Sequence, residues 1–147
     1  MTWIRISVLA LVLVAVVAAV SLGRDRGPGK PVATKYGATS QGRAFFVKLD
    51  ADDRPVAFET SLGALCPTGR MVEMPWAPVD GDGVHFQRRG DRLHLAEHGD
   101  GWRQEIDAEV GAGGRLTGTM TLVVHVTPKT RAAFDCRSPK VRFSAGR

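Results

Sequence analysis

The 147-residue sequence contains no asparagine, and this absence excludes an N-linked glycosylation site, which needs an Asn-x-Ser/Thr sequon. It has no Gly-x-Ser-x-Gly elbow, phosphate-binding loop or dinucleotide fingerprint, so familiar hydrolase and nucleotide-binding signatures are missing. Only two cysteines occur, and they are not spaced as Cys-x-x-Cys, which argues against a dithiol redox site. These absences lean against an enzyme and indicate no particular reaction.

One long apolar run is present, from Ile6 to Leu22, and only Ser7 and Ser21 interrupt it. As a helix it would extend roughly 25 Å, slightly less than the ~30 Å hydrocarbon core of a membrane. It is also at or beyond the upper length of an ordinary signal-peptide core, and Ala19-Val20-Ser21 offers the small residues that signal peptidase needs. The run is therefore either a cleaved signal peptide or a retained transmembrane anchor.

The charges after this run bear on which side of the membrane the body lies. Arg24, Arg26 and Lys30 resist translocation under the positive-inside rule, which by itself would leave the body in the cytoplasm. Asp25 offsets part of that charge, and the cysteine usage fits an oxidising compartment better. We therefore expect an extracytoplasmic body, anchored to the membrane through residues 6–22 or secreted, with a cytoplasmic body as the remaining alternative.

Composition divides the sequence into three parts. Residues 1–22 are the signal peptide or anchor, and residues 23–35, rich in Gly, Pro and charge, are predicted to be a flexible linker. Residues 36–147 suffice for one β-domain with its own core. Lys plus Arg number 20 against 15 Asp plus Glu, a mild excess compatible with a solvated surface or with nearby acidic envelope polymers. The basic clusters, such as Arg88-Arg89 with Arg92, are not interleaved with aromatics, so no nucleic-acid partner is expected.

Alternation of apolar and polar residues predicts strands throughout this domain. The clearest case is Trp102–Val110, whose odd-numbered positions are all charged, and we expect it to form a central hairpin with residues 115–126. Other strands are predicted at residues 44–49, 55–66, 71–74, 84–95 with an interruption at Gly90-Asp91, and 141–145. Phe134 to Cys136 is predicted to be a loop.

About eight short strands without an amphipathic helix predict an all-β fold, preceded by the N-terminal hydrophobic helix. The expected architecture is a single antiparallel sandwich or an up-and-down barrel with meander order. The pattern does not separate the two, although only a barrel would naturally enclose a ligand.

Four short pieces of the sequence from Tyr36 onward belong together: Gly37-Ala38-Thr39-Ser40-Gln41-Gly42, Cys66, the strand from Gly114 to Thr119, and Cys136-Arg137-Ser138 leading into the last strand. In these pieces the sequence resembles uncharacterised exported bacterial β-domains. The resemblance implies an exported β-fold and brings no activity, substrate or catalytic residue.

Cys66 lies at the end of a strand with its side chain on the core face, and Cys136 lies shortly before the last strand. In an exported body, a single disulfide between them is the natural interpretation. It would stabilise the domain by roughly 4 kcal/mol in the chain-entropy treatment. Two buried free thiols in a cytoplasmic body are the alternative.

Three histidines are weak metal candidates: His85, His94 and His98. His94-Leu95-Ala96-Glu97-His98 matches the H-x-x-E-H string of inverted zinc proteases, which requires a helix. Glycines bracket this stretch closely, and on a strand Glu97 would point away from both histidines. We therefore expect solvent-facing histidines and no metal or other cofactor. Asp50-Ala51-Asp52-Asp53 and Asp80-Gly81-Asp82-Gly83 are predicted to be turns, not calcium loops, and Trp76 to close one end of the β core.

The leading functional hypothesis is a non-enzymatic β-domain at the outer face of the cytoplasmic membrane, or released from it, that binds a protein partner or an envelope component. The alternative is a calycin-like barrel that carries a small hydrophobic ligand. An interior filled by Phe58, Trp102, Met120 and Phe143 would argue against the carrier, whereas an apolar cavity of ~300 Å³ or more would support it.

Overall fold

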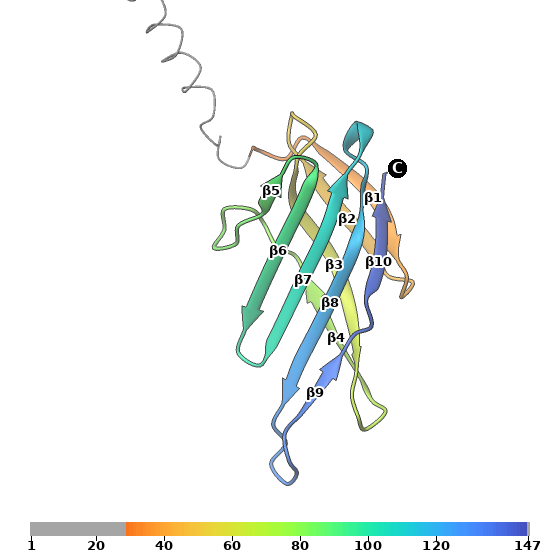
Figure 1. Cartoon of the computed structure of the whole chain (residues 1–147), viewed down its shortest axis with the longest axis vertical. Helices are drawn as coiled ribbons and strands as arrows, with labels where there is room; N and C mark the ends of the chain where they lie inside the picture. Colours follow the sequence, from red (N-terminus) through yellow and green to blue (C-terminus); the bar gives the residue numbers. More distant parts are fainter. Residues whose placement is uncertain (1–28, 147) are drawn as a thin grey trace, which may run out of the picture.

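The structure is a computed structural model that describes residues 29–146, and these residues form an all-β body (Figure 1). The apolar run at residues 6–22, which was predicted to be a signal peptide or a transmembrane anchor, lies outside the described residues. Within residues 29–146, no helix has the length and apolar character that crossing a membrane would require. The described strands and one short 3-10 turn are β1 (Ala33–Thr39), β2 (Ala44–Leu49), β3 (Pro55–Leu65), β4 (Met71–Trp76), β5 (Gln87–Arg89), β6 (Arg92–Gly99), β7 (Trp102–Val110), η2 (Ala112–Gly114), β8 (Leu116–Val126), β9 (Phe134–Arg137) and β10 (Val141–Ala145).

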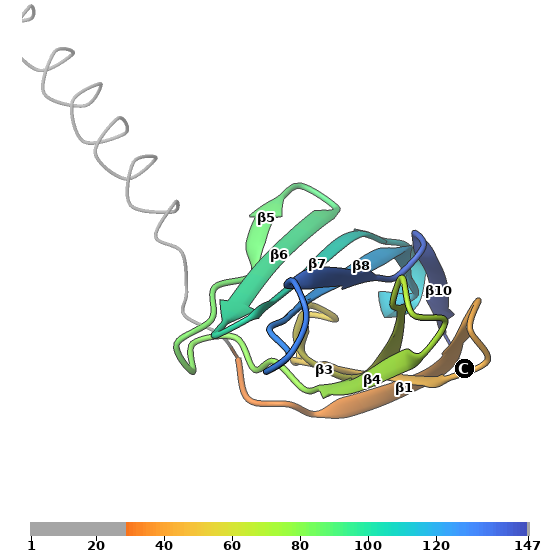
Figure 2. The same ribbon diagram turned by 90° about the horizontal axis from the view of Figure 1, so that it is seen from below.

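Backbone pairing closes six of these strands into a ring, in the order β1–β2–β3–β9–β8–β10 and back to β1. All of these pairs are antiparallel. On the edge of β8 that faces away from the ring, β7, β6 and β5 follow in turn, and β4 pairs with β3. Figure 2 shows the resulting two layers, with β5 to β8 on one side and β1, β3 and β4 on the other. The predicted antiparallel all-β fold is confirmed, and of the two predicted architectures the structure is the barrel.

The predicted meander order is only partly correct. β5 to β8 do form a meander, but β9 and β10 both return to the edge of β8 opposite β7. Ser138 lies between them and takes the place of a ladder residue, because its amide donates to the Leu122 carbonyl and its Oγ accepts from the Leu122 amide, each at 2.8 Å. Beyond Ser138, Pro139 lacks a backbone donor and interrupts the pairing with β8, which resumes at Val141. The chain therefore pairs with β3 before this break and with β1 after it, which closes the ring.

The predicted bounds agree with β2, β7 and β10, and the hairpin of β7 and β8 is confirmed. Three predicted segments differ. β1 begins at Ala33, inside residues 23–35, because backbone pairing with β2 carries this strand although its residues up to Ala38 are exposed or only partly buried. Val84 to Phe86 is not a strand, since Asp80 accepts the Phe86 amide at 3.1 Å and holds this segment in a loop before β5. The segment predicted as a loop at Phe134 is strand β9.

The interior of the barrel is filled by side chains. Phe143 stacks on Phe45 with ring centroids 4.4 Å apart, Phe45 stacks on Phe58 at 5.8 Å, and Phe58 stacks on Phe86 at 4.9 Å. Met120, 1% exposed, packs in the same cluster. Trp102, in contrast with the prediction, is only half-buried, because it lies over Gly99 at the β6–β7 turn instead of entering the core.

Candidate functional site

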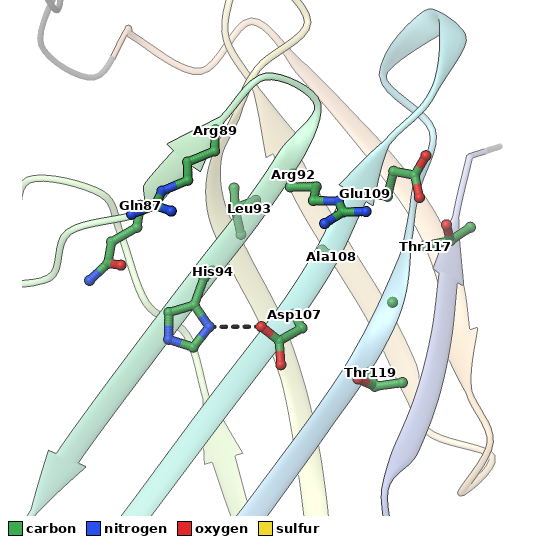
Figure 3. Close-up of a pocket in the computed structure, with 11 residues that line it drawn as sticks. Gln87, Arg89, Arg92, Leu93, His94, Asp107, Ala108, Glu109, Thr117 and Thr119 are labelled. Atoms are coloured by element: carbon green, nitrogen blue, oxygen red, sulfur yellow. Dashed lines mark hydrogen bonds and ion pairs between the residues drawn. The ribbon is translucent and has the colours of Figure 1, made fainter.

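A groove of about 580 Å³ lies on the outer face of the sheet formed by β5 to β8 (Figure 3). The strand register explains how its walls form, because it places outward-facing residues of neighbouring strands in rows. In one row, Arg89 pairs with Arg92, Arg92 with Glu109 and Glu109 with Thr117. A second row, offset by two positions along each strand, consists of Gln87, His94, Asp107 and Thr119.

The two rows differ in how their charges are arranged. In the second row, His94 Nδ1 lies 2.8 Å from Asp107 Oδ1, and Figure 3 marks this contact. In the first row, Arg89 and Arg92 are direct cross-strand partners of like charge, an arrangement that destabilises a sheet. Among residues 29–146, neither arginine has a carboxylate within 4.0 Å. Figure 3 shows their side chains pointing in different directions, Arg89 over β5 and Arg92 over β7.

Gly118 lies between Thr117 and Thr119 on β8 and allows β7 and β8 to approach closely. A Cβ at this position would lie 2.2 Å from the Asp107 carbonyl oxygen and 2.8 Å from the Ala108 Cα. Real Cβ atoms do not approach other atoms so closely, so a larger residue would push the two strands apart. Gly118 thus keeps β7 and β8 close together, and Thr117 and Thr119 on either side of it place two hydroxyl groups in the groove.

The third member of the basic cluster, Arg88, has a structural role. Its guanidinium lies 2.6 Å from Asp80 Oδ2, donates to the Pro55 carbonyl at 2.6 Å and covers the Phe86 ring at 5.5 Å. Arg88 therefore ties the loop before β5 to the opposite layer. Among residues 29–146, Arg88 therefore has a carboxylate partner, whereas Arg89 and Arg92 have none within 4.0 Å.

The histidine candidates do not come together with a set of ligands. His94 and His98 lie on the outer face of β6, as expected for a strand, while Glu97 points inward and accepts from Trp76 Nε1 at 2.5 Å. His85 lies in the loop before β5. Within the described part of the chain, no three His, Cys, Asp or Glu side chains are grouped so that they could hold a metal ion. Trp76 itself is 4% exposed and packs in the core cluster.

A second polar cluster lies on β8 and β9. His125 Nδ1 is 3.0 Å from Asp135 Oδ1, and Arg137 donates to Asp135 Oδ2 at 2.6 Å. The hydrogen bond from His125, together with the charge of Arg137, holds the pKa of Asp135 below its usual value. His125 and Asp135 are register partners, so this cluster supports the strand pairing that closes the ring.

Two further hollows lie elsewhere on the surface. One, of about 630 Å³, lies beside Tyr36 and Arg115. The other, of about 360 Å³, opens at one end of the barrel, where charged turn residues such as Asp52, Arg54 and Asp91 line it. Neither is an apolar chamber inside the barrel.

The protein can also be compared with proteins that are already known. A comparison with them finds no matching family model, no matching curated protein and no matching solved structure. Alternation within Trp102–Val110 predicted that Asp107 and Glu109 face solvent, but only the register shows that they meet Arg92, Thr117 and Thr119 in one groove.

Proposed function

We propose that this protein is an extracytoplasmic, non-enzymatic binding domain, membrane-anchored or secreted, that binds an envelope component through the groove on β5 to β8. The observation that carries the proposal is the contrast between the interior and the outer face. Aromatic side chains fill the interior, whereas the groove offers about 580 Å³ lined by charged and hydroxyl side chains. Polar groups that converge on a hollow are the usual basis of ligand specificity.

Neither alternative function has a comparable observation in its favour. A carrier of hydrophobic ligands needs a hollow interior, and Phe58, Met120 and Phe143 occupy that space. A hydrolase would need a nucleophile next to the His94–Asp107 pair. Among residues 29–146, no hydroxyl or thiol is hydrogen-bonded to His94.

The proposed location outside the cytoplasm rests on the disulfide and on the apolar run. Cys66 and Cys136 are bonded and are 6% and 0% exposed, and such structural disulfides persist in oxidising compartments. Intact masses of the protein from membrane and medium fractions, with and without reductant, test this location. A disulfide-bonded species in either fraction supports it, and a full-length protein in the cytosol with free thiols overturns it.

Binding is tested with the full chain and washed envelope fragments of the producing organism. Thr119→Trp fills the groove, and Thr34→Trp, on the exposed face of β1, adds the same side chain elsewhere. We expect the Thr119 variant to lose most of its co-sedimentation with the fragments, while the Thr34 variant binds like the unmodified chain. Equal binding by both variants, or no binding by the unmodified chain, overturns the proposal.

A further inference from the structure

We propose that the groove binds an acidic carbohydrate, with a carboxylate or phosphate group held between Arg89 and Arg92 and sugar hydroxyls bound by Thr117 and Thr119. This inference rests on the function proposed above and names the ligand chemistry of the same site.

Arg89 and Arg92 lie opposite each other across β5 and β6. β5 has three residues and turns into β6 through Gly90, at φ +63°, and Asp91, which fixes Arg89 opposite Arg92 on the outer face. Directly opposite side chains in an antiparallel pair have Cβ atoms about 5 Å apart. The two guanidinium groups point apart in Figure 3, so binding of one oxyanion between them requires both long side chains to turn toward it. An oxyanion between them replaces repulsion with two charge-assisted, forked contacts, which suit carboxylate and phosphate geometry.

The charges of Arg89 and Arg92 differ from the neighbouring charges in that no ion pair holds them within residues 29–146. Arg88 is paired with Asp80 at 2.6 Å, and Asp107 is engaged by His94 at 2.8 Å. Arg89 and Arg92 lack such a partner within 4.0 Å among residues 29–146. The groove thus presents two positive charges that are free to bind an anion from outside.

Mostly polar side chains lie beside the two arginines in the groove. The groove residues include no Phe, Tyr or Trp, the side chains that most often stack on nucleic-acid bases. They provide hydroxyl, amide and imidazole groups, which bind sugar hydroxyls. The two rows are about 7 Å apart along the strands, so an anion at Arg89 and Arg92 leaves the next part of a sugar chain over Thr119.

Substitution of Glu109 should change the affinity for an anion in the direction opposite to substitution of either arginine. Glu109 faces the groove next to Arg92 and opposes a bound anion. Its neutralisation should therefore strengthen the binding that loss of either arginine weakens. A surface that merely attracts polyanions from a distance would respond weakly to each single change, because such attraction is screened beyond roughly 10 Å.

The test is calorimetric titration of the full chain at low salt. Oligogalacturonate supplies carboxylates and a glycerol-phosphate oligomer supplies phosphates, while neutral dextran, a single-stranded oligonucleotide and phosphatidylglycerol vesicles serve as comparisons. Arg89→Gln and Arg92→Gln are compared with Arg70→Gln, which removes the same charge from the exposed β3–β4 turn. Thermal melting checks folding, and neither groove variant should be destabilised, because each relieves a like-charge pair.

We expect at least one acidic carbohydrate to bind, about tenfold more weakly to each groove variant and several-fold more tightly to Glu109→Gln, with Arg70→Gln unchanged. Which oligomer binds identifies carboxylate or phosphate as the recognised group. Unchanged binding by the arginine variants overturns the inference, and so does equally tight binding of the oligonucleotide or the vesicles. If Thr119→Trp abolishes envelope binding but neither acidic oligomer binds, the ligand class is wrong and the proposed function stands.

Discussion

Cys66 and Cys136 lie directly opposite each other across β3 and β9, one position beyond the paired residues Leu65 and Arg137. Among residues 29–146, that pair is the single backbone register contact between these two strands. The disulfide therefore reinforces the ring where its hydrogen bonding is thinnest, and it closes a separation of 70 positions.

Removal of this bond should strongly destabilise the domain. We expect the double variant Cys66→Ala, Cys136→Ala to lose about 2 to 5 kcal/mol of unfolding free energy, since the unfolded chain regains the entropy of a long loop. Urea unfolding followed by tryptophan fluorescence measures the change. Reductant should lower the midpoint of the unmodified chain and leave that of the variant alone. A variant as stable as the unmodified chain would contradict this role.

Asp50 should make the stability depend on pH in the acid range. Burial opposes its ionisation, but the amides of Arg54 and Asp52, at 3.0 and 2.9 Å, and the Arg54 guanidinium outweigh that cost and lower the pKa of Asp50. Because the pKa of Asp50 is lower in the folded than in the unfolded protein, its ionised carboxylate stabilises the fold. This contribution is complete at pH values above the pKa of the unfolded state, near 3.9, and is lost as the pH falls through the pKa of the folded state.

We therefore expect Asp50→Asn to cost about 1 to 2 kcal/mol at pH 7, with the cost shrinking as the pH falls below 4. Urea unfolding at pH 7 and at pH 3 measures this difference. Asp52→Asn is the matched control, because the Asp52 side chain is 63% exposed, and it should change stability little at either pH. A constant cost of Asp50→Asn at both values would show that its charge does not matter.

A strand could be predicted from the sequence where its buried and exposed residues alternate. β2, β7 and β10 alternate buried and exposed residues, so local pattern sufficed to locate them. β1 presents exposed or partly buried residues before Thr39, and β9 fully buries only Cys136, so neither carries an alternating signal. Both strands exist because of pairing with distant parts of the chain, which a local pattern does not contain.

The same limit applies to the groove. Alternation predicted that Asp107 faces solvent, but the contact between His94 and Asp107, and the opposition of Arg89 and Arg92, depend on register. The loop conformation at Phe86 also depends on a side-chain contact that alternation does not reveal, because the Asp80 carboxylate accepts a hydrogen bond from the Phe86 amide.

Trp76 and Glu97 join the two layers on the side of the barrel where β4 and β6 are not paired through their backbones. Trp76→Phe removes the donor and leaves the Glu97 carboxylate without this partner, so we expect a loss of about 1.5 to 3 kcal/mol. Chemical denaturation monitored by circular dichroism measures it. Glu105→Gln, on the outer face of β7, should change stability by less than about 0.5 kcal/mol. Equal effects of the two substitutions would refute the bridge.

Gly118→Ala should separate β7 from β8. The added methyl would meet backbone atoms of Asp107 and Ala108, which do not yield as a flexible side chain would. We expect a loss of about 1 to 3 kcal/mol, measured by thermal melting, and faster amide exchange along both strands. Thr121→Ala, two positions beyond Thr119 on the same strand, is the control and should cost less.

The most direct test of the account is to map binding on the isotope-labelled full chain by amide chemical shifts during titration with the acidic oligosaccharide that binds. The account predicts that the shifts concentrate at Arg89, Arg92, Glu109, Thr117 and Thr119. Shifts centred on the barrel interior, around Phe58 and Met120, or on the outer face of β1 and β2, would contradict it.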